Sequence, residues 1–195
     1  KCAGQSVENY CKKIGMKIAF LDNQFNKSSS LSWCINSPQH ITGFALSRLF
    51  TNDFFDFSFA VVRNPIDRLR SAFKFQKYKE RKIKKNLTLS NFIRSDLELS
   101  SRYIGYFDNH FLPQVDLLMN KNSYKIFKLE EGLLEVKKYI DDIFLTSNLN
   151  INMEHINSSK FDPNFIDEDN YIDDLSFEII YNVYKKDFES FGYKI

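Results

Sequence analysis

The sequence predicts an α/β fold, because short apolar runs typical of strands alternate with stretches of helical periodicity. The clearest junction follows the run Phe59-Ala-Val-Val, which leads to Arg63 before Asn64-Pro65 turns the chain into an amphipathic stretch. Pro65 suits the first turn of a helix, since its missing N–H would be unpaired there and its fixed φ matches helical geometry. Such strand-to-helix junctions are where α/β proteins commonly bind ligands.

The predicted helices are identified by apolar residues that recur at helical intervals. In the segment after Pro38, for example, Ile41, Phe44, Ala45 and Leu49 share one helical face. The predicted helices are Gln5–Ile14, Ile41–Phe50, Pro65–Lys79, Leu89–Arg94, Glu130–Phe144 and a final one with Ile180, Val183, Tyr184, Phe188 and Phe191 in register and Gly192 as its stop.

Strands and loops are predicted between these helices. The apolar runs Met16–Leu21, Asp56–Val62 and Tyr124–Leu129 are predicted strands. The polar stretch Asp22–Ser32 is a predicted loop, and Asn148–Asp174, which is rich in Asn, Ser and Asp, is expected to form an irregular loop or lid. A polar and aromatic connection without regular structure is expected to run through Asp108.

Length and composition favour one domain over residues 1–195. A chain of 195 residues with 43% hydrophobic content can bury one core and is too short to argue for two. Cys2, Cys11 and Cys34 are odd in number and lack CxxC spacing, so neither a disulfide framework nor a metal site is indicated, and a reducing compartment is the simpler expectation. No apolar run reaches transmembrane length, and no secretory signal is visible.

Positive charge is concentrated in one block. Between Arg63 and Lys85 there are ten Lys or Arg and two acidic residues, a local charge of +8, although the whole chain carries only +2. Such a block can attract a polyanion, or it can be the solvated end of a helix. No aromatic-basic repeat or zinc-ligand spacing indicates a nucleic-acid module.

The start of the helix at Pro65 has the chemistry of an anion site. Arg63 offers a guanidinium, Ser71 offers a hydroxyl, and the helix dipole is positive at this end, which together suit a phosphate-like dianion. A purely structural interpretation is also open, in which Arg63 pairs with Asp67, and Arg68 and Arg70 form a solvated helix face.

A second candidate anion loop lies at the beginning of the sequence. In Lys1-Cys-Ala-Gly-Gln-Ser-Val7 the small residues Ala3 and Gly4 let an oxyanion approach the backbone, Ser6 adds a hydroxyl and Lys1 adds a positive charge. The lysine precedes the glycine, unlike the lysine of G-x-x-x-x-G-K-[ST], so an ATP or GTP hydrolase is disfavoured. A chance helix cap is the alternative explanation.

These two segments resemble those of carbohydrate sulfotransferases, including the uronyl 2-O type, whose donor is 3'-phosphoadenosine 5'-phosphosulfate (PAPS). Arg63-Asn-Pro-x-Asp-Arg-Leu-x-Ser71 is similar to their 3'-phosphate-binding segment, and Lys-x-Ala-Gly-x-Ser is similar to their 5'-phosphosulfate loop. The resemblance implies a P-loop-like three-layer fold, with a central, mainly parallel sheet flanked by helices. In that family a strand precedes the loop, so it is open whether the strand before Lys1 is missing.

The resemblance also implies roles for individual residues. Arg63 and Ser71 would hold the 3'-phosphate, and the seven residues of the first loop, Lys1, Cys2, Ala3, Gly4, Gln5, Ser6 and Val7, would hold the 5'-phosphosulfate, with Lys1 also stabilising charge during transfer. His40 matches the placement of the family's general base, although such a histidine can equally cap or pack a helix. An imidazole can take the proton of a sugar hydroxyl near neutral pH.

Three weaker resemblances extend the similarity along the chain. His110-Phe-Leu-Pro-Gln114 is similar to a His-x-x-Pro-Gln segment of the family, so His110 and Gln114 would orient the acceptor or the sulfuryl group. The structural alternative is that a bend at Pro113 needs these polar residues for its own hydrogen bonds. His155-Ile-Asn-Ser-Ser159 resembles a late loop that covers the nucleotide. The ending Asp187-Phe-Glu-Ser-Phe-Gly-Tyr193 is also similar to the family's.

The expected reaction is transfer of a sulfuryl group from PAPS to a hydroxyl of a polysaccharide or glycan, leaving adenosine 3',5'-bisphosphate and needing no metal. Two alternatives stay open: a nucleotide-dependent phosphotransferase, and a non-catalytic module that binds polyanions through the basic block. Bacterial relatives are cytoplasmic and eukaryotic ones work in the Golgi lumen; the cytoplasm is the favoured location. Neither a nucleic-acid partner nor a transmembrane segment is expected.

Overall fold

The computed structural model describes residues 2–22, 24–25, 34–120, 123–154, 156 and 171–194. Its α-helices are α1 (Gly4–Lys13), α2 (Gly43–Leu49), α3 (Pro65–Lys74), α4 (Leu89–Ser95), α5 (Leu97–Arg102), α6 (Leu134–Phe144) and α7 (Asp174–Phe191), and its strands are β1 (Phe59–Val62) and β2 (Lys125–Lys128). Short 3₁₀ helices span Pro38–His40, Tyr106–Asn109, Gln114–Leu117, Leu129–Glu131 and Ser147–Leu149, and a π-helical turn, Phe75–Lys79, continues α3.

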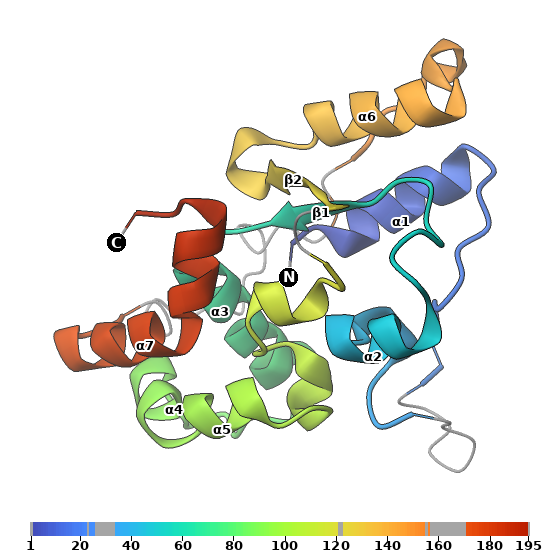
Figure 1. The fold of residues 1–195 in the computed structure, drawn as a ribbon. Helices are drawn as coiled ribbons and strands as arrows, with labels where there is room; N and C mark the ends of the chain where they lie inside the picture. The colour runs from blue at the N-terminus through green and yellow to red at the C-terminus, as the bar shows by residue number, and fades with distance from the viewer. Residues whose placement is uncertain are drawn as a thin grey trace.

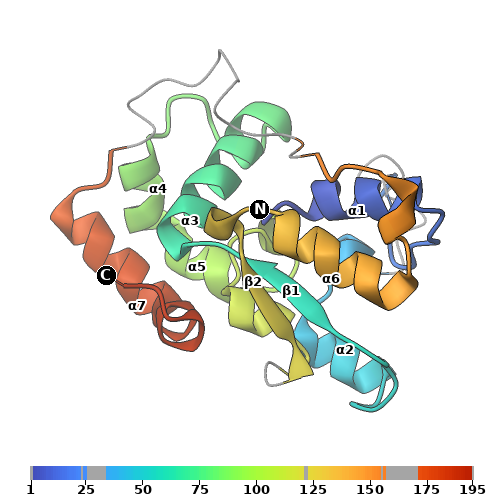
Figure 2. The same cartoon turned by 90° about the horizontal axis from the view of Figure 1, so that it is seen from above.

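The two strands form a small parallel sheet. Phe59 lies opposite Lys125, and Val62 lies opposite Lys128. A parallel pair needs a long crossover, and here α3, α4 and α5 lie in the connection from β1 to β2 (Figures 1 and 2). The structure is therefore α/β, as the sequence predicts. Within the described residues the sheet has two strands, so a three-layer arrangement around a larger sheet stays a prediction.

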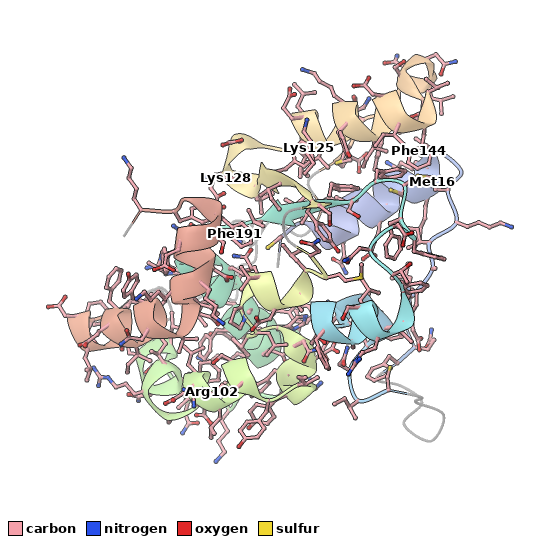
Figure 3. The ribbon with its side chains drawn as sticks, viewed as in Figure 1. Met16, Arg102, Lys125, Lys128, Phe144 and Phe191 are labelled. Atoms are coloured by element: carbon pink, nitrogen blue, oxygen red, sulfur yellow. The ribbon has the colours of Figure 1, made fainter. Side chains whose placement is uncertain are left out.

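Two hydrophobic cores flank the point where β1 ends. One lies between the sheet and the helices α1 and α6, and its buried members are Tyr10, Phe127, Leu133, Val136 and Ile140. The other joins α3, α4, α5 and α7, with Phe73, Phe92, Phe111, Ile180 and Tyr184 among its buried members. Figure 3 shows Phe144, at the end of α6, far across the molecule from Arg102, at the end of α5. The segment from β1 to α3 connects the two cores.

Most predicted elements are confirmed, with bounds that differ by a few residues, and the differences have local causes. The predicted strand Met16–Leu21 is wrong: this stretch is irregular and turns at Phe20, whose φ is 57°. Helix α5 was missed, because six residues make fewer than two turns and give little periodicity. Helix α6 begins four residues later than predicted, after the 3₁₀ helix Leu129–Glu131 and Gly132, whose φ of 88° cannot continue a helix.

Helix ends follow the sequence signals. Asn64 caps α3, its Oδ1 accepting from Ile66 N at 3.0 Å, with Pro65 at the first helical position. Gly192 ends α7 with a φ of 64°, as predicted. None of the helices within the described residues is long and apolar enough to span a membrane.

Gly43 lets α2 approach the chain just after the 3₁₀ helix Gln114–Leu117. A Cβ at this position would lie 2.0 Å from Leu118 O and 2.7 Å from Met119 N, which are backbone atoms. The side chain of Thr42 caps α2 by accepting from Ala45 N at 3.2 Å, so α2 is fixed in place directly after His40. A glycine is required here for close packing and not for its backbone angles.

We expect Gly43→Ala to lower the free energy of unfolding by about 1–3 kcal/mol, because the added methyl group must push α2 away from residues 118–119. Chemical denaturation of both proteins measures the difference. Gly4→Ala is a suitable control for stability, since a Cβ there would meet only the Glu8 side chain, at 3.8 Å. Equal losses in the two variants would contradict the close-packing explanation.

Candidate active site

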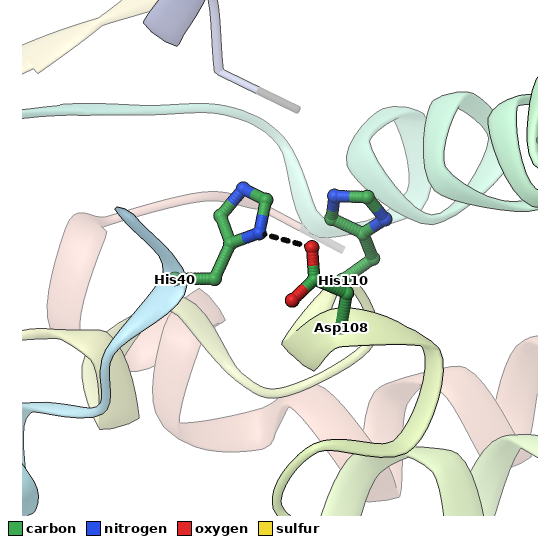
Figure 4. A group of neighbouring side chains, drawn as sticks. All are labelled: His40, Asp108 and His110. Atoms are coloured by element: carbon green, nitrogen blue, oxygen red, sulfur yellow. Dashed lines mark hydrogen bonds and ion pairs between the residues drawn. The ribbon is translucent and has the colours of Figure 1, made fainter. Parts of the chain in front are cut away.

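His40 and Asp108 form a hydrogen-bonded pair although they are far apart in the sequence. Nδ1 of His40 lies 2.8 Å from Oδ2 of Asp108 (Figure 4). Ser37 joins them, because its N–H donates to Asp108 Oδ1 at 2.6 Å and its hydroxyl lies 2.7 Å from Oδ2 and 2.8 Å from His40 Nδ1. The carboxylate side chain is 11% exposed and the imidazole 33% exposed, so the imidazole is the more accessible member of the group.

The protonation states within this group follow from its hydrogen bonds. Burial alone would raise the pKa of Asp108, but the hydrogen bonds from His40 and Ser37 outweigh it and hold this pKa below its usual range. An ionised carboxylate only accepts, so Nδ1 of His40 carries a proton and a neutral ring has its lone pair on Nε2. Nε2 points away from Asp108 (Figure 4) and has no hydrogen-bond partner among the described residues. It is therefore available to accept a proton.

A left-handed turn presents Asp108. Phe107, Asp108 and Asn109 have φ values of 48°, 56° and 60°. Asp and Asn tolerate this region, whereas an aromatic residue is strained in it, at an energetic cost of about 1–3 kcal/mol. The Asn109 side chain accepts from Gly105 N at 2.6 Å and donates to His40 O at 2.8 Å. The turn thus holds both the carboxylate and the backbone of the histidine that pairs with it.

His110 lies against His40 at the same site. The two ring centroids are 4.7 Å apart in an edge-on arrangement, and His110 is 7% exposed. On its other side His110 meets the Phe75 ring and the Gln76 amide. Ligand atoms of His40, Asp108 and His110 lie within 4.8 Å of one another, so these three residues could hold a metal ion. The expectation of a reaction without metal stays a prediction.

Gln114 connects the two segments predicted to bind the donor. Its Oε1 accepts from Arg63 N at 2.9 Å and from Cys2 Sγ at 3.2 Å. Its Nε2 donates to Arg63 O at 2.8 Å and to Asp187 Oδ2 at 3.4 Å. These contacts use all four hydrogen-bonding positions of the amide. Gln114 therefore fixes the chain at the end of β1, and its predicted contact with substrate stays a prediction.

A buried carboxylate supports Gln114 from α7. Asp187 is 0% exposed, and its two oxygens accept from Gln114 N at 2.8 Å and Val115 N at 2.9 Å. Burial raises the pKa of Asp187, while these two amides and Arg68 oppose the shift. Arg68 is itself only 3% exposed and donates to Leu112 O at 2.7 Å, so the alternative that placed it on a solvated face is wrong.

Arg63 and Ser71 flank the first turns of α3, as the sequence indicates. Among the described residues, neither the Arg63 guanidinium nor the Ser71 hydroxyl makes a hydrogen bond or ion pair. Asp67, the alternative partner of Arg63, instead lies 3.3 Å from Arg70 Nη1. Within the part of the chain that the structure describes, both predicted phosphate ligands therefore stand at a helix start without a protein partner.

A carboxylate also reaches this helix start. Glu130 Oε1 accepts from Asn64 N at 2.7 Å, and Tyr193 donates its hydroxyl proton to Glu130 Oε2 at 3.0 Å. Lys128 Nζ lies 4.8 Å from the centroid of the Tyr193 ring. These contacts attach the end of the chain to the segment after β1.

The predicted phosphosulfate loop leads directly into α1. Ala3 has a φ of 59°, and Gly4 is the first helical residue, so the first turn of α1 directly follows this loop. The N–H groups of Ser6 and Val7 donate to Ala3 O at 2.9 and 3.2 Å. Ser6 is 1% exposed, and its Oγ accepts from Ile156 N at 2.8 Å. Lys1 lies outside the described residues, as does the segment His155–Ser159 apart from Ile156.

Sequence reasoning missed Ser37, Gln76, Asp108 and Asp187. A local signal existed for Asp108, because Asp-Asn after Gly105 favours a left-handed turn next to His110. Ser37 stands three residues before His40, but its hydroxyl joins the site only because Asp108, from a distant segment, lies next to it. The other two act across long sequence separations, so their contacts had no local signal.

Comparison with known proteins gives one match. A family model described as "Sulfotransferase family" matches residues 1–194. No curated protein and no solved structure matches the chain. Because the family match runs over nearly the whole chain, it includes every residue of the site.

We expect Asp187→Asn to lower the free energy of unfolding by about 1–3 kcal/mol. Both oxygens of Asp187 accept from backbone N–H groups. In asparagine an NH₂ group would replace one of these oxygens, so two hydrogen-bond donors would face each other without an acceptor. Denaturation followed by circular dichroism measures the effect. Glu189→Gln, on an exposed pair of the same helix, is the control and should change little. An Asp187→Asn protein as stable as this control would contradict the role assigned to the carboxylate.

Proposed function

The chain belongs to the sulfotransferase family, and we propose that it transfers a sulfuryl group from PAPS to a hydroxyl group of a carbohydrate. The observation that carries the proposal is the group of His40, Asp108 and Ser37, in which the carboxylate holds the imidazole proton on Nδ1 and leaves Nε2 to act as a base. A P-loop-like relationship of the fold is part of the same proposal.

In the proposed reaction the acceptor oxygen attacks sulfur in line with the leaving group. The new bond joins acceptor oxygen to sulfur, and the bond between sulfur and the bridging oxygen breaks. Its electron pair leaves with adenosine 3',5'-bisphosphate, and the acceptor proton goes to His40 Nε2. Asp108, ionised beside Nδ1, then stabilises the imidazolium, and Ser37 keeps the carboxylate in position.

Two helix starts support the assignment of a donor with phosphate groups at both ends. The positive end of the α1 dipole faces the predicted phosphosulfate loop, and the start of α3 offers Arg63 and Ser71 without protein partners among the described residues. Gln114 bonds to the residues that precede both helices, so the two anion sites are held at a fixed separation. A rigid pair of anion sites suits one ligand with two anionic groups.

A shallow depression formed by residues close in sequence to the site supports a carbohydrate acceptor. It has a volume of about 500 Å³ and is lined by Ile35, Leu99, Tyr103, Ile104, Gly105 and Tyr106. Tyr103 and Tyr106 are 62% and 45% exposed, and each ring combines an apolar face with a polar edge. A sugar has the matching character, since it carries both C–H faces and hydroxyl groups. Ile35 and Tyr106 of this depression stand two residues from Ser37 and Asp108 in the sequence, and we propose that it binds the sugar chain whose reacting unit lies at His40.

The proposed function is tested by incubating the protein with sulfur-labelled PAPS and a panel of oligosaccharides. We expect labelled product with the wild type, no transfer of phosphate from labelled ATP, and a rate lower by about 10²–10⁴ in His40→Ala, which loses its base. Asp108→Asn should also be slow, because an amide cannot stabilise the imidazolium. Binding of PAPS to His40→Ala should be retained. An active His40→Ala would remove this residue from the mechanism.

The donor site is tested by titrating adenosine 3',5'-bisphosphate into Arg63→Ala in a calorimeter. Loss of a charge-assisted hydrogen bond worth about 1.5–3 kcal/mol should weaken binding about 10- to 150-fold. Arg70→Ala is the matched control, because Arg70 stands on the same helix and pairs with Asp67. If Arg63→Ala and the wild type bind with equal affinity, Arg63 does not hold the 3'-phosphate.

A further inference from the structure

Gln76 fixes the orientation of the His110 ring from inside the protein. It is 0% exposed and lies in the π-helical turn Phe75–Lys79. Its Nε2 lies 3.1 Å from Phe107 O and 2.6 Å from His110 Nδ1. π-Helical turns are rare and often occur at functional sites, because the extra residue redirects a side chain. Here the redirected side chain meets a histidine of the candidate active site.

The contacts of Gln76 decide which nitrogen of His110 carries the proton. Phe107 O is a carbonyl and only accepts, so the amide must turn its NH₂ group toward it. The same NH₂ group then donates to His110 Nδ1, which must present its lone pair. The contact with Phe107 O keeps the amide in this orientation. As a consequence, the buried Gln76 Oε1 has no hydrogen-bond partner among the described residues. The His110 proton therefore lies on Nε2.

The two neighbouring histidines are thus held as opposite neutral tautomers. His40 has its proton on Nδ1, toward Asp108, and its lone pair on Nε2. His110 has its lone pair on Nδ1, toward Gln76, and its proton on Nε2. The two rings flank the Asp108 carboxylate, with centroids 4.7 Å apart (Figure 4). One ring can accept a proton and the other can donate a hydrogen bond to the same reacting group.

We infer that His110 donates a hydrogen bond from Nε2–H to an oxygen of the sulfuryl group during transfer, and that Gln76 is the positioning residue that keeps the proton on this nitrogen. The inference rests on the proposed function. The His110 proton stays on His110 throughout, while the acceptor proton goes to His40. The hydrogen bond stabilises negative charge on the sulfuryl oxygens as the sulfur passes between oxygen atoms.

The protonation of His110 can be measured without any substrate. The chain has three histidines, so ¹⁵N-labelled imidazole signals can be assigned with His40→Ala and His155→Gln variants. Long-range ¹H–¹⁵N spectra of the neutral imidazoles should show His110 protonated on Nε2 and His40 on Nδ1. In Gln76→Glu the carboxylate would accept from the ring, so a proton should appear on His110 Nδ1. A wild-type His110 protonated on Nδ1 would overturn the inference.

The catalytic role is tested by placing an amide donor at either nitrogen of the ring. In His110→Gln the NH₂ group falls near the position of Nε2, and in His110→Asn it falls near Nδ1. We expect His110→Gln to keep kcat within about tenfold of the wild type and His110→Asn to lose about 10²–10³ in kcat, with similar KM for PAPS. Equal kcat values in the two variants, both with native melting behaviour, would overturn the donor role.

These outcomes are separable from those of the proposed function. A wild-type protein that transfers no sulfuryl group would count against the proposed function, and the spectra would still decide the protonation of His110. Gln76→Leu supplies a further comparison, because leucine fills a similar volume without an N–H group. If Gln76 only packs, Gln76→Leu should keep the wild-type kcat, and this result would overturn its positioning role.

Discussion

The buried carboxylate of Asp187 is the constraint on which the site depends. It lies on α7 with no exposed surface and accepts from the two backbone N–H groups that begin the 3₁₀ helix Gln114–Leu117. With its backbone held in this way, the Gln114 side chain reaches both backbone groups of Arg63 and the thiol of Cys2. Three segments that are distant in the sequence are therefore connected through a single amide.

A buried charge of this kind is costly, and the structure shows how its cost is offset. Asp187 accepts from two backbone amides, and the guanidinium of Arg68 lies near enough to affect its pKa. Arg68 in turn donates to Leu112 O, two residues before Gln114. Breaking one member of such a network leaves other buried groups unpaired, so its members depend on one another. The network also explains why an arginine of the basic block lies inside the protein.

The histidine pair shows a second use of hydrogen bonds, which is the placement of protons. His40 and His110 have the same side chain, and their protons differ only because one meets a carboxylate and the other an amide N–H group. Asp108 occupies its position because three consecutive residues adopt left-handed backbone angles. The strain of Phe107 in this turn is offset by the contacts of Asp108 and Asn109, which together hold His40.

The elements that the sequence predicted well are those with long apolar periodicity or a distinct end signal. The Asn64-Pro65 start of α3 and the Gly192 end of α7 are read from single residues whose backbone preferences are strong. The short run Met16–Leu21 was mistaken for a strand, because a six-residue segment with five apolar residues does not show whether a partner strand exists. The face of α2 that was expected from its periodicity includes Phe44 and Leu49, which are 69% and 55% exposed.

The sequence by itself determined the fold class, the two helix starts predicted to bind anions and the family resemblance, because these depend on the local order of residues. Only the tertiary structure decided that Asp108 and Ser37 accompany His40, and that Arg68 is buried. It also showed that Gln114 is fully engaged by Arg63, Cys2 and Asp187. The physical reason is that a side chain's protonation and hydrogen bonds depend on its neighbours in space. Those neighbours come from segments whose meeting is fixed by packing rather than by any local pattern.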